Sequence, residues 1–337
     1  MNYRLDEKGE RKRPLFALTM GDPAGIGPEI ALKAYKNQNF MNSVVIVGDT
    51  GVLAASTRNR LSEIPLHPVA TVSGFREGTV NVIECEALAP GTYRTGKTQA
   101  VCGRASFRYI EKAIDLALEG AVDGVITNPI NKESLHAAGI DYPGHTEIFA
   151  EKTGSDRYSM LFLLKNVGVA HVTTHCSLRQ AIGLVTTERV LAAIRLLDET
   201  MIRLGSAAPR IAVGGLNPHA GENGLFGHEE IHLIQPAIAA ARSEGITVSG
   251  PFPPDTVFMR AFRGEFDGVV AMLHDHGFVA LKSMDFEHGV NITIGLPIIR
   301  TSVGHGTAFD IAGKGIASPE SLLAAFDAAE RLYRSRH

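Results

Sequence analysis

Short apolar runs alternate with amphipathic stretches along most of this 337-residue chain. The runs expected to form strands are 15–20, 44–47, 122–127, 160–164, 167–173, 211–215, 269–273 and 290–294. The stretches expected to form helices include 28–35, 98–119, 187–204, 229–243 and 319–333. Strands and helices in alternation build βαβ units, in which parallel strands are buried between layers of helices. The chain is therefore predicted to be an α/β protein with a mainly parallel sheet.

The composition argues against several classes of partner. With a formal net charge of -3, the chain has no global basic field that would attract nucleic acid or an anionic membrane. Residues 1–14 are polar, and no apolar run has the length of a membrane span or the form of a signal sequence. The three cysteines form no metal or redox spacing, which suits free thiols in a reducing compartment. We expect a cytoplasmic protein that acts on a small molecule.

Three of the apolar runs lead into a histidine: His175, His219 and His274. A buried strand with an imidazole at its end places that ring at the crevice outside a parallel sheet, where α/β proteins bind ligands. Taken singly, a histidine beside apolar residues is more often a core or surface residue. Three in equivalent positions, each next to turn or polar residues, instead predict a catalytic metal site.

A second set of polar residues suggests an anion site. Lys282, Asn291 and Arg300 follow the third histidine at nine-residue intervals, and two cations with an amide suit a phosphate or carboxylate. Solvated surface charge is the alternative interpretation. His145 and Thr146 stand near a predicted helix start, where polar side chains bind anions or simply cap the helix.

The segment 21–29, GDPAGIGPE, follows the first predicted strand and opens a helix. Such a loop can point backbone N–H groups at an anion, but a tight turn between strand and helix explains it equally well. It matches neither the dinucleotide fingerprint GxGxxG nor the P-loop, so neither of those nucleotide sites is predicted here.

Taken together, the segments resemble the 4-hydroxythreonine-4-phosphate dehydrogenase family of vitamin B6 synthesis, with its relatives that act on 4-phospho-threonate or 4-phospho-erythronate. The resemblance covers nearly the whole chain after residue 14. The motifs that carry it are GDPAGIGPEI, TNPINKESLHAAG, YPGHTE, TTH, GLNPHAGENGLFGHEE, GPFPPDT, LHDHG, GVNITIGLPIIRTS and HGTAFDIAGKG.

The resemblance implies a fold of the isocitrate and isopropylmalate dehydrogenase type, with two α/β/α domains and an active-site cleft between them. The expected division is a polar arm at 1–14, a first domain at 15–130 plus about 301–337, and a second domain at 131–300. It also implies a homodimer that uses NAD and one divalent metal ion per site, Zn, Mg or Co. His175, His219 and His274 match the family's metal ligands, and the third is expected to come from the neighbouring subunit. The residues at its substrate-binding positions are His145, Thr146, Lys282, Asn291 and Arg300.

The activity implied is oxidation of the C3 hydroxyl of a 4-phosphorylated four-carbon hydroxy acid, followed by loss of CO2. Hydride transfer would belong to the cofactor, and a metal with three neutral histidines would keep positions open for substrate. Asp255 in PPDT and Asp275 beside His274 are candidates for orienting a ligand or handling a proton, with a cap or turn role as the alternative.

Two departures from the family pattern bear on the substrate. The chain has His276 where the family commonly has Gln, and Gly304 where it commonly has Asp. The segment NPHAGENGLFG resembles the phospho-threonate and phospho-erythronate branch, which is the alternative substrate class. A related dihydrodiol dicarboxylate dehydrogenase lacks GHTE, so retention of that motif favours a phosphorylated substrate. A metal hydrolase of phosphorylated compounds and a non-catalytic metabolite-binding protein are the alternatives from other classes.

Overall fold

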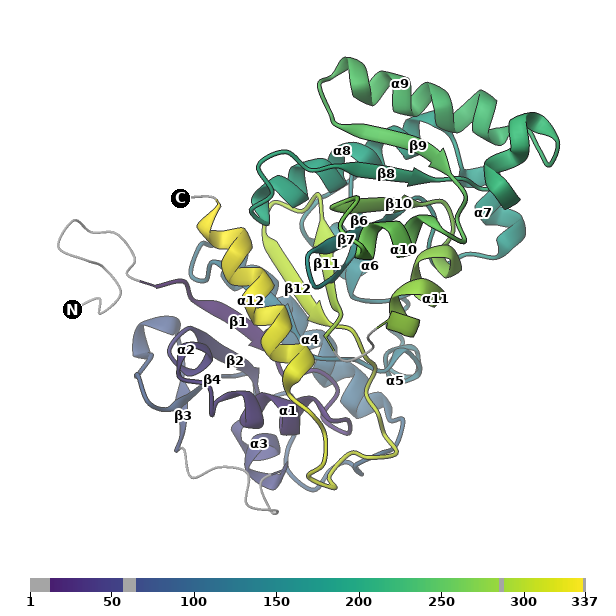
Figure 1. Cartoon of the computed structure of the whole chain (residues 1–337). Helices are drawn as coiled ribbons and strands as arrows, with labels where there is room; N and C mark the ends of the chain where they lie inside the picture. The colour runs from purple at the N-terminus through teal and green to yellow at the C-terminus, as the bar shows by residue number, and fades with distance from the viewer. Residues whose placement is uncertain (1–12, 57–64, 285–287, 336–337) are drawn as a thin grey trace. The chain divides into compact units, whose positions relative to one another are not determined.

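The computed structural model describes residues 13–56, 65–284 and 288–335. These residues form two compact units (Figure 1): unit 1 takes the described residues up to Gly154 together with Pro297–Arg334, and unit 2 is Ser155–Leu296. The predicted boundaries between the two domains lay near residues 130 and 300. Residues 131–154 belong with unit 1, because helices α5 (Lys132–Ala137) and α6 (His145–Lys152) pack on α4 (Ala100–Leu118).

The strands of unit 1 lie in the order β3-β4-β2-β1-β5-β12, and neighbouring strands are parallel. Their bounds are β1 (Phe16–Thr19), β2 (Val44–Gly48), β3 (Leu66–Val69), β4 (Val80–Glu84), β5 (Gly124–Thr127) and β12 (Ile299–Val303). Thr19 of β1 and Ser302 of β12 both stand opposite Thr127 of β5. Residues opposite one another point to the same face of a sheet, so this row lies on one side.

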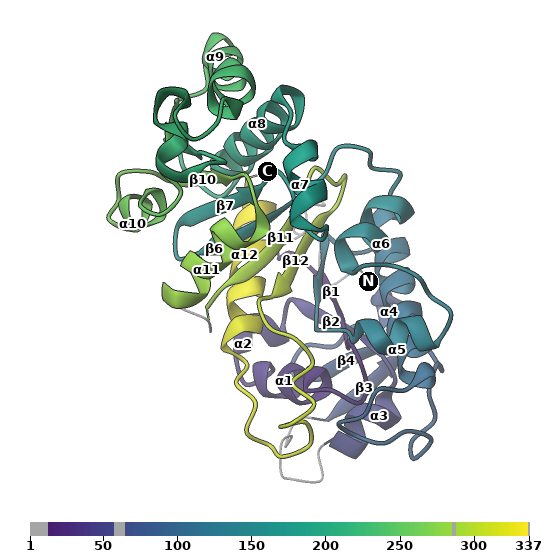
Figure 2. The ribbon, with the colours of Figure 1, turned by 90° about the vertical axis from the view of Figure 1, so that its right-hand side faces the viewer.

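Helices cover both faces of this sheet (Figure 2). In that view α4, α5 and α6 lie on one side of the strands, and α1 (Gly27–Ala34) and α12 (Glu320–Arg334) lie on the other. Two shorter helices, α2 (Gln38–Met41) and α3 (Thr50–Ser56), complete the unit. The buried side chains of α4 recur every three or four residues, which is why one stripe of that helix faces the sheet. A Cβ atom at Gly103 would lie 2.0 Å from the Ser134 carbonyl oxygen, so only glycine lets α5 approach this closely.

The strands of unit 2 lie in the order β11-β6-β7-β10-β8-β9. Their bounds are β6 (Ser159–Leu164), β7 (Val167–His171), β8 (Ile211–Gly214), β9 (Val248–Phe252), β10 (Gly268–Ala271) and β11 (Val290–Ile294). The pairs β11–β6 and β6–β7 are antiparallel, whereas β7, β10, β8 and β9 are parallel. Strands β6 and β7 form a hairpin because Lys165 adopts a left-handed conformation, φ 56°, between them.

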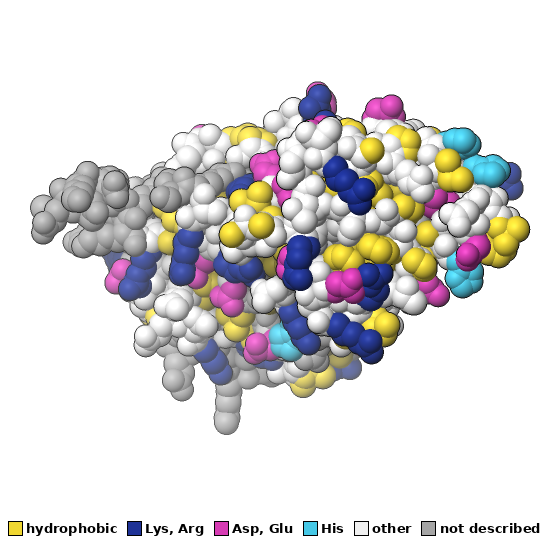
Figure 3. Space-filling view, turned by 45° about the horizontal axis from the view of Figure 1, so that its top comes forward, with side chains coloured by type: hydrophobic (Ala, Val, Ile, Leu, Met, Phe, Trp, Pro, Cys, Tyr) yellow, Lys and Arg dark blue, Asp and Glu magenta, His cyan; other side chains and the backbone are white. Residues whose placement is uncertain are grey.

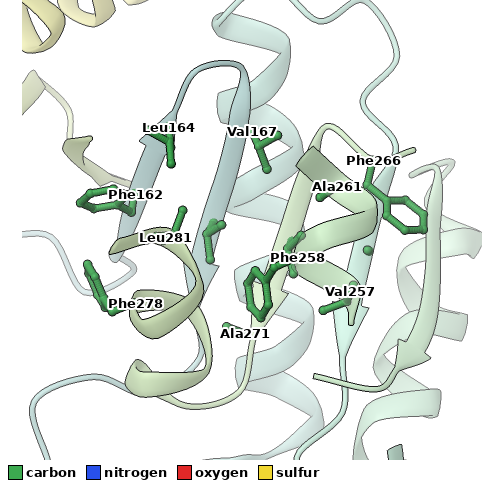
Figure 4. Packing of buried hydrophobic residues seen from close by; sticks show 13 residues of the cluster. Phe162, Leu164, Val167, Val257, Phe258, Ala261, Phe266, Ala271, Phe278 and Leu281 are labelled. Atoms are coloured by element: carbon green, nitrogen blue, oxygen red, sulfur yellow. The ribbon is translucent and has the colours of Figure 1, made fainter. Parts of the chain in front are cut away.

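Most of the helices of unit 2 pack on its strands, around a core that contains several phenylalanines. The helices are α7 (Leu178–Leu184), α8 (Thr187–Arg203), α9 (Gln235–Ser243), α10 (Val257–Phe262) and α11 (His274–Met284). Figure 4 shows Phe278 and Leu281 of α11 lying against Phe162 of β6, with Phe258 of α10 in the same cluster. The rings of Phe162 and Phe278 meet edge to face at 5.3 Å, which adds to the apolar burial that fixes α11.

Each predicted strand and helix segment contains an observed element, and the mainly parallel α/β class is confirmed. Strands β3, β4, β9 and β12 were not predicted. No helix in the described ranges is both long enough and apolar enough to cross a membrane. On the face drawn in Figure 3, Lys and Arg side chains are interspersed with Asp and Glu, in keeping with the small net charge.

Candidate active site

Two of the three predicted metal-binding histidines line one pocket of unit 2. The pocket has a volume of about 200 Å³, and its walls include His175, Leu178 and His274. The imidazole centroids of His175 and His274 are 6.0 Å apart, with the rings inclined at 46°. This separation suits two imidazoles that approach one ion, since each nitrogen would stand about 2.0–2.1 Å from a zinc.

The register of β7 and β10 explains why these two histidines meet. His171 and Ala271, the last residues of the two strands, stand opposite each other in parallel register. The residues that follow therefore leave the sheet at the same edge. The Thr173 hydroxyl donates to the Met272 carbonyl at 2.8 Å and holds the two segments together. Position 175 then comes beside position 274, where α11 begins.

The two predicted aspartates differ in their surroundings. Asp275 Oδ1 lies 2.7 Å from His274 Nδ1, the kind of contact that fixes the tautomer and orientation of a metal-binding imidazole. Asp255 lies in an exposed turn between β9 and α10 and is not among the residues that line the pocket.

A fourth histidine, His171, was not singled out from the sequence. It is buried at the end of β7, and its ring stacks on Phe278 at 4.9 Å with an interplanar angle of 11°. Burial lowers the pKa of His171 to about 3, and the neighbouring His274 acts in the same direction. A Cβ at Gly277 would stand 2.3 Å from His171 Nε2, which explains the glycine of the HDHG segment. In the sequence, only the position of His171 four residues before His175 draws attention to it.

His219 is not among the residues that line the pocket. It belongs to the segment Pro218–Gly224, where His219, Ala220, Glu222 and Asn223 all have positive φ between 43° and 54°. The backbone N–H groups of Leu216 and Asn217 each donate to the Glu230 carboxylate at 2.8 Å, which anchors the start of this segment. Among the residues that the structure describes, no three His, Cys, Asp or Glu side chains lie close enough together to hold a metal ion. One chain thus brings two of the predicted ligands together.

Unit 1 contains a cationic cluster built around Arg300, which lies on β12 and is 3% exposed. Its Nη2 donates to the Thr127 hydroxyl at 2.7 Å, and its guanidinium carbon lies 5.5 Å from the centroid of the Phe149 ring. Burial lowers the pKa of Arg300 to about 9, while the Glu147 carboxylate acts in the opposite direction.

His145, the first residue of α6, belongs to the same cluster. Its Nε2 atom is enclosed by protein and has no hydrogen-bond partner within the part of the chain described. Burial holds the pKa of His145 well below its usual range, and the charges of Arg300 and Lys132 lower it further. The ring is therefore neutral at pH 7. A neutral imidazole next to a buried guanidinium can donate a hydrogen bond to an anion, and because it is uncharged it does not repel the guanidinium.

The remaining predicted substrate residues lie in both units. Thr146 follows His145 in the first turn of α6. Lys282 is in the last turn of α11, with its Nζ 5.5 Å from the Phe278 ring centroid. Asn291 is on β11, opposite Phe162 of β6. The structure thus brings His145 and Arg300 together within unit 1 and places Lys282 and Asn291 in unit 2.

The glycine-rich segment 21–29 borders a second cavity, of about 490 Å³, within unit 1. Tyr93, Thr95 and Gly313 are among the other residues of its wall. Asp22 holds the turn by accepting from the Ala24 N–H at 2.8 Å, and burial raises the pKa of Asp22 to about 6. Glu29 accepts from the Ala317 N–H at 2.8 Å, which ties helix α1 to the segment that carries Gly313. From the sequence, this segment could be an anion-binding loop or only a tight turn, and the cavity was not predicted.

Comparison with known proteins identifies the class of this α/β protein, because its relatives are named dehydrogenases, which are oxidoreductases. The model of the family described as "Pyridoxal phosphate biosynthetic protein PdxA" matches residues 40–329. The 4-hydroxythreonine-4-phosphate dehydrogenase of Beijerinckia indica is 50% identical over 319 residues, 94% of this chain and 94% of that protein. The D-threonate 4-phosphate dehydrogenase of Cupriavidus necator is 47% identical over 317 residues, 93% of this chain and 95% of that protein. The chain belongs to the PdxA family.

Solved structures agree with this assignment. The crystal structure of a 4-hydroxythreonine-4-phosphate dehydrogenase from Klebsiella pneumoniae is 46% identical, with a TM-score of 0.84 over 95% of this chain and 99% of that one. A β-decarboxylating dehydrogenase from Thermococcus kodakarensis is 15% identical, with a TM-score of 0.51 over 93% of this chain and 81% of that one, and it shows the shared fold alone. The predicted family and the predicted fold class are both confirmed.

Proposed function

We propose that this protein oxidises the C3 hydroxyl of a 4-phosphorylated four-carbon hydroxy acid with NAD, and that the resulting β-keto acid is decarboxylated. The observation that carries the proposal is the pairing of buried Arg300 with neutral His145. A guanidinium binds phosphate through charge-assisted, often bidentate hydrogen bonds, and a substrate phosphate would be such a ligand for Arg300. A phosphate held there would anchor one end of a short flexible molecule and orient its hydroxyl.

The residues of the His175 pocket fit a divalent metal ion, Zn, Mg or Co. His175 and His274 would supply two imidazole ligands, and Asp275 would hold the His274 ring with its Nε2 available. His219 would be the third ligand. When bound, the ion would polarise the oxygen at C3 and NAD would accept the hydride from that carbon. We place NAD beside the glycine-rich segment 21–29. Several glycines line the 490 Å³ cavity of unit 1, and glycine allows the close approach of a pyrophosphate group to the protein backbone.

We further propose a cytoplasmic homodimer with a metal site shared between its subunits. Because His175 and His274 of one chain already lie together, the ligand that the neighbouring subunit adds would be His219, in place of the His274 expected from the family resemblance. Two observations support a partner at the His175 pocket. Leu178, which lines the pocket, is 65% exposed, and Ile182 on the same short helix α7 is 52% exposed. Apolar side chains left exposed beside a polar site are typical of a protein interface. One chain also brings only two of the three histidines together.

Two substrates remain as candidates within this class. The first is 4-hydroxythreonine 4-phosphate, named for the Beijerinckia relative, and the second is 4-phospho-D-threonate or 4-phospho-D-erythronate. The Cupriavidus relative, named for D-threonate 4-phosphate, is almost as similar and supports the second. Both candidates present the same phosphate to Arg300 and differ at C2, where one carries an amine and the other a hydroxyl.

The experiment is a substrate screen with the full-length protein. The three phosphorylated acids are each tested for NADH formation with Zn, Mg or Co added, and their unphosphorylated forms serve as matched controls. We expect NADH and CO2 from at least one phosphorylated acid and from none of the controls. Phosphate release without NADH would point to a hydrolase and refute the proposal. Equal rates with and without the phosphate group would refute the anion site.

A further inference from the structure

Two uncharged side chains, Thr127 and Phe149, contact the Arg300 guanidinium. A guanidinium binds phosphate through a planar fork, so its plane and its rotation decide whether two N–H groups reach two oxygens together. Thr127 contacts one end of the fork, at Nη2, and Phe149 lies against the cation. All three side chains are buried, with Thr127 and Phe149 at 0% exposure.

The Thr127 hydroxyl has a defined direction. Its Oγ1 donates toward the Thr301 carbonyl at 3.4 Å, which leaves lone pairs for the Arg300 N–H group. The Thr127 backbone is itself held between two strands, because its carbonyl accepts from the Ser302 hydroxyl at 3.2 Å and Thr19 pairs with it on the other side. The hydroxyl that accepts from Arg300 is therefore carried by a backbone that the sheet holds in place.

We propose that Thr127 is a positioning residue for the phosphate site, and that its hydroxyl holds the Arg300 fork in the orientation that binds a phosphate group. The proposal rests on the proposed function, because it assumes that Arg300 is the group that contacts phosphate. Thr127 acts through Arg300 and does not itself touch the substrate.

The chain offers a matched control. Thr301 is also fully buried, and it follows Arg300 directly on β12. Successive residues of a strand point to opposite faces, and the Thr301 hydroxyl donates to the Ala325 carbonyl of α12 at 2.8 Å. Replacing Thr301 with Val removes a buried hydroxyl and its hydrogen bond on the side away from the Arg300 guanidinium. Any general cost of such a change appears in both variants.

The test measures the Kd of inorganic phosphate by phosphorus NMR for the full-length protein and four variants. We expect Thr127→Val to weaken phosphate binding about tenfold, equivalent to ~1.4 kcal/mol. Thr127→Ser restores wild-type affinity because it keeps the hydroxyl, and Thr301→Val binds as the wild type does. Arg300→Met binds phosphate least well. Circular dichroism checks that each variant folds, and Thr127→Ala replaces Thr127→Val if that variant does not.

The outcomes separate this inference from the function on which it rests. If Arg300→Met binds phosphate as well as the wild type, the anion site itself is wrong. If Arg300→Met binds phosphate more weakly than the wild type while Thr127→Val and Thr301→Val bind it equally well, the anion site stands and the positioning role is overturned. If Thr127→Ser binds phosphate as weakly as Thr127→Val, the positioning role is also overturned, since Thr127→Ser keeps the hydroxyl.

Discussion

Replacement of Arg300 tests the chemistry of the proposed phosphate site most directly. Arg300→Met keeps a long side chain beside Phe149 but removes the charge and all five N–H donors. Arg300→Lys keeps a positive charge but replaces the planar fork with a single ammonium group. The pair of variants therefore separates the contribution of charge from the contribution of geometry.

The magnitude follows from the contacts. A hydrogen bond to a charged group is worth about 1.5–3 kcal/mol, which corresponds to about 10- to 150-fold in a dissociation constant. We expect Arg300→Met to raise the KM for the phosphorylated substrate within that range. Because Arg300 is only 3% exposed, solvent ions screen its charge little and the effect should persist in salt. Arg300→Lys should fall between Met and wild type, since it loses the contact to Thr127.

Steady-state kinetics provide the assay. The KM for the phosphorylated acid and the inhibition constant of inorganic phosphate should rise together, because the phosphate group is what the two ligands share. The KM for NAD should change little and serves as the internal control. Unchanged constants for both phosphate ligands in Arg300→Met would show that this buried guanidinium has a purely structural role, and the reasoning would fail.

Three further predictions concern other parts of the chain. His219→Ala and His274→Ala should each lose bound metal and turnover. Mixing the two variants under subunit exchange should restore roughly a quarter of wild-type sites, because each mixed dimer keeps one intact site. If mass spectrometry confirms the exchange and no activity returns, a shared site is excluded. His145 is protonated near pH 6.5 in the unfolded chain but stays neutral in the folded chain. Below pH 6.5 the free energy of unfolding of the wild type should therefore fall more steeply than that of His145→Gln. The difference in slope, measured by urea titrations, should be at most about 1.4 kcal/mol per pH unit. Glu29→Gln should lower the free energy of unfolding by about 1–3 kcal/mol, because this buried carboxylate accepts from two backbone N–H groups and from Lys33; an unchanged urea midpoint would contradict that.

The apolar runs were sufficient to predict the central strands but not β12. Strands such as β2, with the sequence VVIVG, are continuous apolar segments because both faces are covered. Strand β12 reads IRTSV and is just as buried, but Arg300 and Thr301 interrupt the pattern. Its polar side chains are satisfied by particular neighbours, Thr127 on one face and Ala325 on the other. A periodicity argument cannot detect a strand whose buried residues are polar.

The histidine segments show a similar limit. The sequence indicated that all three histidines follow apolar strands, but the strand β10 ends at Ala271 and His274 begins a helix. The segment around His219 contains four non-glycine residues with positive φ, a conformation disfavoured for each of them locally. Contacts distant in sequence, such as those from Glu230, stabilise it. Local propensity therefore gave no indication of that backbone.

The electrostatics of unit 1 fit the proposed role of Arg300 as the cation that would bind phosphate. A second positive charge at His145 would repel Arg300 across a poorly solvated space, and the low pKa of His145 avoids that repulsion while no anion is present. The Thr127 hydroxyl satisfies one donor of the guanidinium without neutralising its charge. A carboxylate in place of Thr127 would pair with Arg300 more strongly and would compete with a phosphate for the same N–H groups. In the proposed role, Thr127 would therefore hold the guanidinium of Arg300 as an uncharged acceptor on a buried strand, and would leave the charge of Arg300 available to the phosphate.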